Sequence, residues 1–356
     1  MKQLIGAGLA MLMTISGIPA YAEGIDNRVT VLNPGYVQPI EGRGFLPGAQ
    51  DDGARKVAST ISLVQGEDFI LVADPGMAAV GVWDAVLAQL KAKDVEPADV
   101  THIFISHHHP DHVTQLGLFP NATLVDFWAT YKDDVWSDHP DNYELAPGVK
   151  VVRTPGHTDQ DASLLVETLE GTYALTHLWW TPGYEPKEDP LAEDSREIVH
   201  SRAMILKEAD WIVPGHGALF RNAEKQAEAI HDEDRARVLA AVQTASDAWV
   251  NDFNDGDAKA TAKHYEADAV MTPQPFGVFT GRQNIQAFWS DLISKGFSDV
   301  RYINPSIEVI SPNAAILSSG WEMNKAHGTI TKELWVVQRN GEAKLRVDNF
   351  QVADEK

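Results

Sequence analysis

A cluster of metal-binding side chains lies in one short segment, Ser106-His107-His108-His109-Pro110-Asp111-His112. Side chains two residues apart on an extended segment point to the same side, so the imidazoles of His107 and His109 can reach a common point. Pro110 fixes the backbone after them, and Asp111 and His112 can then turn toward a second point nearby. This spacing suits two neighbouring divalent ions.

Two isolated histidines follow strand-like runs and stand beside glycine. They are His157, in Thr154-Pro155-Gly156-His157-Thr158, and His216, in Val213-Pro214-Gly215-His216-Gly217. Glycine lets the backbone approach a metal closely because it carries no side chain. The chain has no cysteine, so its ligands must be His, Asp or Glu, which zinc accepts. We expect each of these histidines to supply one further ligand.

The order of these motifs resembles the metallo-β-lactamase superfamily, whose pattern is His-x-His-x-Asp-His, Gly-His, a bridging acid and a last Gly-His. The resemblance covers residues 28–222 and implies an αββα sandwich that holds one or two zinc ions. It implies that the first zinc is bound by His107, His109 and His157, and the second by Asp111, His112 and His216. The neighbourhood Leu116-Gly117-Leu118-Phe119-Pro120 further resembles the branch typified by metallo-β-lactamase domain-containing protein 1.

The expected bridging Asp is missing, and the stretch where it would stand reads Ala174-Leu175-Thr176-His177-Leu178. A carboxylate bridges two cations with its two oxygens, whereas a neutral imidazole offers one lone pair. His177 therefore binds one metal, leaves the ions bridged by hydroxide alone, or points away. Asp74, in Asp74-Pro75-Gly76, follows a strand and can orient a metal-bound histidine; a simple turn is the alternative.

A divalent ion in such a site activates water and stabilises the anion formed when a carbonyl is attacked. Asp111 is the candidate catalytic residue, because it can accept a proton or orient the nucleophile in addition to binding metal. We expect a zinc-dependent hydrolase of a small ester, lactone, thioester or β-lactam. Aromatic residues lie between the ligand segments and favour a substrate with an apolar part. Alternatively, they pack in the core. They are Phe127, Trp128, Tyr131, Trp136, Trp179, Trp180 and Tyr184.

Between residues 28 and 220, short β-rich runs alternate with helical stretches, which is typical of an α/β fold. Residues 57–64 and 68–73 are expected to pair around a turn at 65–67, and residues 80–93 have the apolar spacing of a helix. Residues 101–106 form a buried strand that delivers the histidine cluster. Further strands are expected at 149–152, 162–166, 173–176 and 211–213.

The C-terminal part, residues 236–353, resembles the nuclear transport factor 2-like, SnoaL-like family. Four segments carry the resemblance, at 248–257, 264–270, 281–289 and 332–336. It implies an α+β cone. The residue pattern itself predicts a helix over 223–250, followed by a short helix, a hairpin around Gly277, a helix over 284–295 and strands near 307–309, 314–321, 334–337 and 345–350. The expected use of the cone is homodimerisation or shaping of the zinc pocket.

The net charge and the first 22 residues limit the class of protein. A formal net charge of −22 disfavours nucleic acid as a partner. Residues 1–22 have the basic, apolar and Ala-x-Ala order of a signal peptide, which predicts a periplasmic or secreted protein, and no later segment is apolar enough to span a membrane. The expected domains are therefore a hydrolase at 23–228 and a cone at 236–353.

Two other functions stay open. The missing bridging acid fits a non-hydrolytic metal- and ligand-binding protein. Isomerase or cyclase activity in the C-terminal cone is the other possibility, because enzymes of that fold need only an acid and a base facing a buried pocket.

Overall fold

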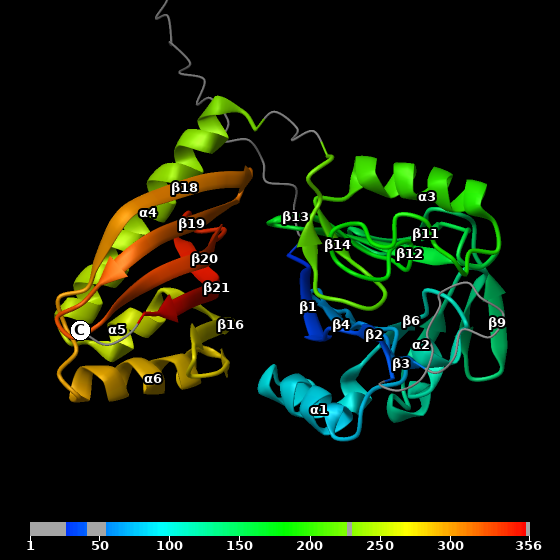
Figure 1. The fold of residues 1–356 in the computed structure, drawn as a ribbon, viewed down its shortest axis with the longest axis horizontal. Coiled ribbons are helices and arrows are strands. Elements are labelled where there is room, and N and C mark those ends of the chain that lie inside the picture. The colour runs from blue at the N-terminus through cyan, green and yellow to red at the C-terminus, as the bar shows by residue number, and fades with distance from the viewer. Residues whose placement is uncertain (1–25, 41–54, 226–229, 354–356) are drawn as a thin grey trace, which may run out of the picture.

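The computed structural model describes residues 26–40, 55–225 and 230–353, and the expected signal peptide at 1–22 lies outside them. These residues form two units, each with its own sheets and helices (Figure 1). Within the described residues, no helix is both long and apolar enough to cross a bilayer.

Two sheets pack face to face in the N-terminal unit. The first has seven strands, in the order β1 (Arg28–Asn33), β4 (Ile61–Gln65), β5 (Ile70–Ala73), β6 (His102–Phe104), β7 (Thr123–Val125), β8 (Ala129–Lys132) and β9 (Val135–Asp138). The second has six, in the order β10 (Tyr143–Ala146), β11 (Val149–Arg153), β12 (Ala162–Thr168), β13 (Gly171–Leu175), β14 (Trp211–Val213) and β15 (Phe220–Arg221).

Helices cover the outer faces of both sheets (Figure 1). On β5, Leu71 and Ala73 face the second sheet, and Val72 between them packs toward α1 (Val82–Ala92). The second sheet likewise packs its outer face on α3 (Ser195–Glu208), where Ile212 meets Ile198. Side chains of a strand alternate between faces, so strands buried on both sides read as continuous apolar runs. The αββα sandwich expected from the sequence is confirmed.

Short elements complete this unit. A separate ribbon pairs β2 (Tyr36–Pro39) with β3 (Arg55–Ala58). A short helix, α2 (Pro110–Val113), carries part of the histidine segment, and single 3₁₀ turns occur at Pro97–Asp99 and Leu116–Leu118.

The expected strand over 57–64 is two strands, β3 and β4, because the chain is not in a strand at Ser59 and Thr60. The Thr60 backbone N–H donates to the Gly215 carbonyl at 2.7 Å, and its hydroxyl donates to the Gly217 carbonyl at 3.0 Å. These bonds tie the break to the loop that carries His216. The pairing of β4 with β5 around the 65–67 turn is confirmed.

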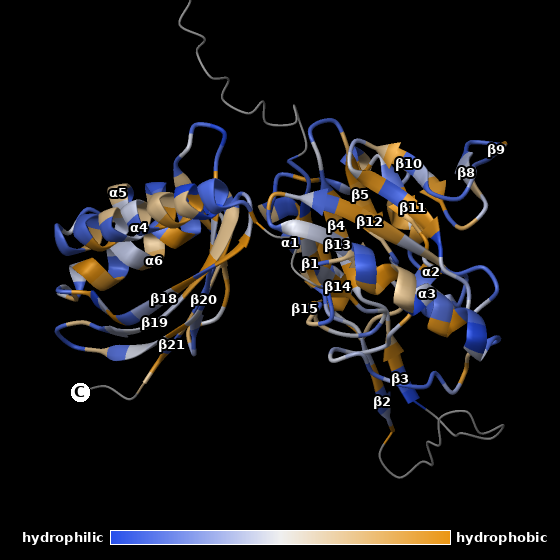
Figure 2. Cartoon of the chain, turned by 90° about the horizontal axis from the view of Figure 1, so that it is seen from above, coloured by the Kyte–Doolittle hydropathy of each residue, from blue (hydrophilic) through white to orange (hydrophobic). Residues whose placement is uncertain are grey.

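The C-terminal unit is a mixed six-stranded sheet with helices over one face (Figure 2). Its strand order is β17 (Phe279–Thr280), β16 (Tyr265–Gln274), β21 (Ala343–Val352), β20 (His327–Val337), β19 (Ala314–Glu322) and β18 (Arg301–Ser311). The helices are α4 (Asp232–Asn254), α5 (Ala258–Lys263) and α6 (Arg282–Ser294). This is the α+β architecture expected from the sequence.

The opening helix begins later than expected. Residues 223–225 are not helical, because the Asn222 side-chain oxygen accepts the backbone N–H groups of Glu224 and Lys225 and holds them in a turn. Such local bonds compete with helix formation. Helix α4 starts at Asp232, within the segment where we expect the change of domain.

Buried charges join the two units. Arg346 on β21 has both Glu170 of the N-terminal unit and Glu266 of its own unit as ion-pair partners. A second contact joins Arg28 on β1 to Asp268, which Lys93 at the end of α1 also approaches at 3.7 Å. Both glutamate side chains are only 2% exposed, so this interface depends on its cations.

Candidate metal centre

Strand ends bring the expected ligands to one edge of the sandwich. Strands β5 and β6 are parallel, and Asp74 and His107 follow them closely. Strands β11, β13 and β14 also run in one direction, since β13 pairs parallel with β14 and both β11 and β13 pair antiparallel with β12. His157, His177 and His216 lie in the loops after these three strands.

The first group of potential ligands is His107, His109 and His157, whose ligand nitrogens lie within 4.8 Å of one another. Nδ1 of His109 is 2.9 Å from Nε2 of His107 and 3.2 Å from Nε2 of His157. Three lone pairs can thus converge on one ion. His109 is exposed whereas the other two are buried, so the group can be reached from solvent.

The second group is Asp111, His112 and His216. An Asp111 carboxylate oxygen lies 3.6 Å from Nε2 of His112 and 3.6 Å from Nε2 of His216. The two groups are neighbours, because the rings of His107 and His112 lie 4.3 Å apart between centroids.

His177 lies inside the cluster. It forms a third set of potential ligands with His107 and His112, and its Nε2 is 3.0 Å from Nε2 of His216. Its ring is buried between the other two groups, where a bridging carboxylate would be expected.

The donor set fits a divalent metal. Nε2 of His112 and Nδ1 of His177 are buried without a hydrogen-bond partner, which is costly unless something else binds them. Burial, helped by the neighbouring imidazoles, lowers the pKa of His107 and His177 well below the usual value and that of His216 to about 4. Neutral imidazole is the form that binds metal.

His112 is the exception. Burial lowers its pKa, but the Asp74 carboxylate, with an oxygen 3.1 Å from Nδ1, outweighs burial and leaves the pKa raised. Asp74 also accepts the backbone N–H of Ser106 at 2.8 Å. Asp74 therefore joins strand β5 to the histidine segment and holds the His112 ring through Nδ1, which leaves Nε2 directed toward Asp111.

Two orienting contacts were not expected from the sequence. Nδ1 of His157 lies 2.9 Å from an Asp189 oxygen, which also accepts the indole N–H of Trp180 at 3.0 Å. Nδ1 of His216 donates to the Ala58 carbonyl at 2.8 Å. Asp189 stands in an irregular loop 32 residues after His157, and no spacing pattern connects the two. The acceptor for His216 is a backbone carbonyl, which every residue type has, so the sequence gives no sign of this contact.

Glycines allow close packing here, but against protein rather than directly against metal. A Cβ on Gly215 would lie 2.3 Å from the His177 ring, and one on Gly156 would lie 2.4 Å from the Ile198 backbone at the start of α3. A Cβ on Gly76 would lie 1.6 Å from the Asp111 carbonyl oxygen. Each of these glycines lets a segment near the ligands pack closely against a neighbouring part of the chain.

The aromatic residues divide between the core and the neighbourhood of the metal centre. Trp179 is buried against α3 with Tyr184 packed beside it, and Trp136 on β9 is 60% exposed. Near the ligands, the Trp180 ring lies 6.3 Å from the His157 ring, and Trp128 lies 5.8 Å from His108. Only part of the aromatic set therefore lies near the histidine cluster.

Residues 54–216 match the metallo-beta-lactamase superfamily. Metallo-beta-lactamase domain-containing protein 1 of Xenopus laevis is 36% identical over 212 residues, which make up 57% of this chain and 84% of that protein. An N-acyl homoserine lactonase of a Bacillus species is 32% identical over 142 residues, 35% of this chain and 57% of the lactonase. Among solved structures, a ketosteroid isomerase-like protein from Erwinia carotovora covers 33% of this chain and 96% of its own, with 16% identity and a TM-score of 0.30.

Proposed function

Because the chain belongs to the metallo-β-lactamase superfamily, whose members are hydrolases, we propose that it is a zinc-dependent hydrolase of small esters or lactones. The observation that carries this proposal is the pair of adjoining ligand groups at one edge of the sandwich, with two buried imidazole nitrogens that have no other partner. The seven ligands proposed are His107, His109, His157, Asp111, His112, His216 and His177.

Each residue has a task in this proposal. His107, His109 and His157 hold the first ion, and Asp111, His112 and His216 hold the second. A bound zinc supplies a water that ionises near neutral pH. Asp111 is partly exposed and its carboxylate lies 3.6 Å from Nε2 of His216, so it can orient the attacking water and receive its proton.

His177 makes the two sites unequal. Its Nε2 lies 3.0 Å from Nε2 of His216, and a neutral imidazole, which has one lone pair, cannot bridge two ions. We propose that His177 completes the second site and that this second zinc is held less tightly than the first.

The substrate class rests on charge and on the nearby rings. A net charge of −22 repels polyanionic substrates, whereas Trp128, 37% exposed beside His108, gives the neighbourhood apolar surface. The similarity to a lactonase over 142 residues makes a lactone the first substrate to test. Thioesters and β-lactams remain within the same chemistry, because each presents a carbonyl to the nucleophile.

The test counts metals and measures turnover in the same preparation. The zinc-reconstituted chain should contain one or two zinc ions by plasma emission spectroscopy. It should hydrolyse at least one of N-hexanoyl homoserine lactone, p-nitrophenyl butyrate and nitrocefin. His109→Ala should lose about 100-fold or more in turnover together with bound zinc, while His200→Ala, at an exposed histidine of α3, should change neither. Less than one metal per chain with no turnover would overturn the hydrolase proposal, whereas bound zinc without turnover would favour a non-hydrolytic metal- and ligand-binding protein.

A further inference from the structure

Two neighbouring strands join the contact between the units to two of the proposed metal ligands. Strand β13 pairs parallel with β14, and Tyr173 lies opposite Trp211 where the pairing begins. At the other end, His177 follows β13 and His216 follows β14. Each strand is short, so whatever holds its first residues is only a few residues of extended chain away from a ligand.

The start of this strand pair is buried against the C-terminal unit. The carboxylate of Glu170, just before β13, forms an ion pair with Arg346 and accepts a hydrogen bond from the Tyr173 hydroxyl at 3.3 Å. The Glu170 backbone carbonyl accepts the indole N–H of Trp211 at 3.1 Å. The ammonium group of Lys332 lies 4.7 Å from the centre of the Trp211 ring. Two cations of the C-terminal unit therefore contact the first residues of both strands.

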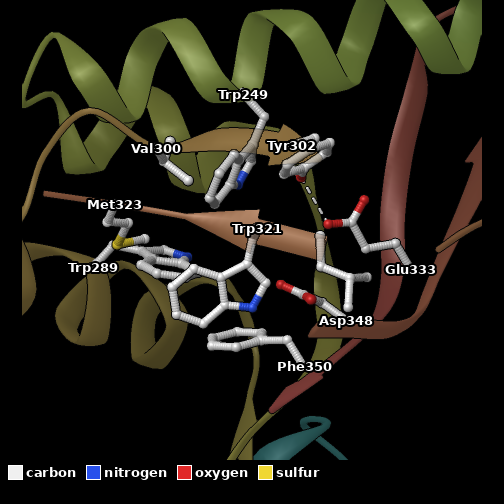
Figure 3. Close-up of a pocket in the computed structure, with 10 residues that line it drawn as sticks. Trp249, Trp289, Val300, Tyr302, Trp321, Met323, Glu333, Asp348 and Phe350 are labelled. Atoms are coloured by element: carbon white, nitrogen blue, oxygen red, sulfur yellow. Dashed lines mark hydrogen bonds between the residues drawn. The ribbon is translucent and has the colours of Figure 1, made fainter. Parts of the chain in front are cut away.

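The C-terminal sheet presents these cations on the face away from its helices. Glu333 and Asp348 lie opposite each other on β20 and β21, on the face that the helices cover (Figure 3). Neighbouring side chains of a strand point to opposite faces, so Lys332 points the other way and meets Trp211. The pairing of β20 with β21 shifts register beside Arg346, and such a bulge redirects a side chain.

The pairing of the two strands continues into the loops that carry the ligands. The Gly215 backbone N–H donates to the Trp179 carbonyl at 2.9 Å, and the His216 N–H donates to the Trp180 carbonyl at 2.6 Å. A Cβ on Gly215 would lie 2.3 Å from the His177 ring, so the two loops are in close contact. A shift of β14 against β13 would therefore move one ligand relative to the other.

The other proposed ligands follow different strands. Those in the segment 107–112 come after β6, and His157 comes after β11. The second contact between the units joins Arg28 to Asp268. It begins at β1, and the chain after β1 continues into β2 rather than into a ligand segment. Of the two contacts, the one at Glu170 is thus the one directly connected to the second metal site.

We propose that Glu170, held by Arg346, is a positioning residue for the second metal site. The C-terminal unit fixes the start of β13 against β14, and this pairing sets the spacing of His177 and His216 at the other end. The inference rests on the proposed zinc centre for its effect on metal binding, whereas its effect on the two loops holds without zinc. Loss of the contact weakens the second site and leaves the first little changed.

Three variants of the full chain test the proposal. Glu170→Gln removes the charge that pairs with Arg346, which keeps Glu266 as its partner. Lys332→Met removes the cation that lies over the first residue of β14 and keeps an apolar stem. Asp268→Asn weakens the other contact between the units and is the matched control.

Amide hydrogen exchange of the zinc-free chain measures the effect on the loops. In Glu170→Gln and Lys332→Met, exchange at Gly215 and His216 should become about threefold to tenfold faster. Exchange at Ser106, whose N–H is bonded beside the first site, should stay as in the parent. In Asp268→Asn, all three amides should exchange at the parent rate.

Zinc titration against a chromophoric chelator measures the effect on the metals. Relative to Asp268→Asn, the affinity of Glu170→Gln and Lys332→Met for the second zinc should fall about threefold to tenfold, and their affinity for the first should change by less than about twofold. Parent-like exchange at Gly215 and His216 in both variants would overturn the proposal, as would equal losses at the two zinc sites. A parent chain that binds no second zinc would overturn the proposed two-metal centre instead, and the exchange rates would then decide this inference alone.

Discussion

His177 occupies the most unusual position at the metal centre, because a bridging carboxylate is expected where its ring lies. The ring touches both ligand groups, with Nε2 3.0 Å from Nε2 of His216, and cannot bridge two ions with one lone pair. In the proposed two-metal centre, the balance between the two sites would depend on this single side chain.

Replacing His177 with Asp should strengthen the second zinc site. A carboxylate offers two oxygens and a negative charge between the ligand groups, so we expect the affinity for the second ion to rise about tenfold or more while the first is little changed. Zinc titration against a chromophoric chelator measures both constants. His200→Asp, on the exposed side of α3, is the matched control, and equal second-site affinity in His177→Asp and the parent would contradict the assignment.

Asp189→Asn tests the contact that orients His157. The carboxylate accepts from His157 Nδ1 and from the Trp180 indole, which fixes the ring with Nε2 toward His109. Loss of such a contact costs about 10- to 100-fold in metal affinity or activity. The neighbouring exposed Glu188 supplies the control, Glu188→Gln, and similar zinc affinity for the two variants would show that Asp189 does not position the ligand.

At the residue scale, the sequence predicts the candidate ligands better than it predicts the hydrogen-bond partners that orient them. His107, His109, Asp111 and His112 stand close enough in the chain for spacing to predict convergence. The partners of His157 and His216 are a distant loop carboxylate and a backbone carbonyl, and neither produces a pattern. Asp74 could be anticipated only because it directly follows a strand.

At the scale of elements, the strands and helices of the sandwich were predictable where apolar residues recur at the spacing of a strand or a helix. Helix α3 was not expected, because its buried face includes Ser201 and Arg202 beside Ile198 and Ile205, which hides the apolar stripe. The break at Ser59 and Thr60 was also missed. Thr60 is a β-forming residue type, but its hydrogen bonds to the loop of His216 take the place of sheet pairing.

Helix α3 and the loop of His157 depend on Gly156. This residue has φ of 151°, and an added Cβ would lie 2.4 Å from the Ile198 Cα. Gly156→Ala should therefore destabilise the chain by about 2 kcal/mol or more, through backbone strain and overpacking. Urea unfolding measures the change against Gly117→Ala, whose Cβ meets nothing within 4 Å; the same midpoint for both variants would disprove the close contact.

The acidic pair Glu333 and Asp348 of the C-terminal unit should influence the stability of the whole molecule. Burial raises the pKa of Glu333 to about 8 and that of Asp348 to about 7 in the folded chain, whereas unfolded carboxyls titrate near pH 4. The folded chain therefore keeps protons that the unfolded chain releases. The contribution of the pair to stability is complete below about pH 4 and falls as pH rises toward 7 to 8, by up to about 1.4 kcal/mol per pH unit for each group.

Urea unfolding at pH 5, 6 and 7 checks this sign. Between pH 5 and 7, the double variant Glu333→Gln, Asp348→Asn should lose less stability, or gain more, than the parent. Asp255→Asn, at an exposed carboxyl after α4, should follow the parent. Parallel curves for the parent and the double variant would mean that the two acids are ionised in the folded chain.

The Arg346 contact also determines whether the two units can be separated. Glu170 belongs to the N-terminal unit, yet its buried carboxylate has its ion-pair partner in the C-terminal one. A hydrolase fragment cut in the linker would lose that cation, just as an exchanged C-terminal domain would unless it supplied an arginine at the same place. The N-terminal unit is thus not an interchangeable module, because its stability depends on a residue that lies beyond the domain boundary in the sequence.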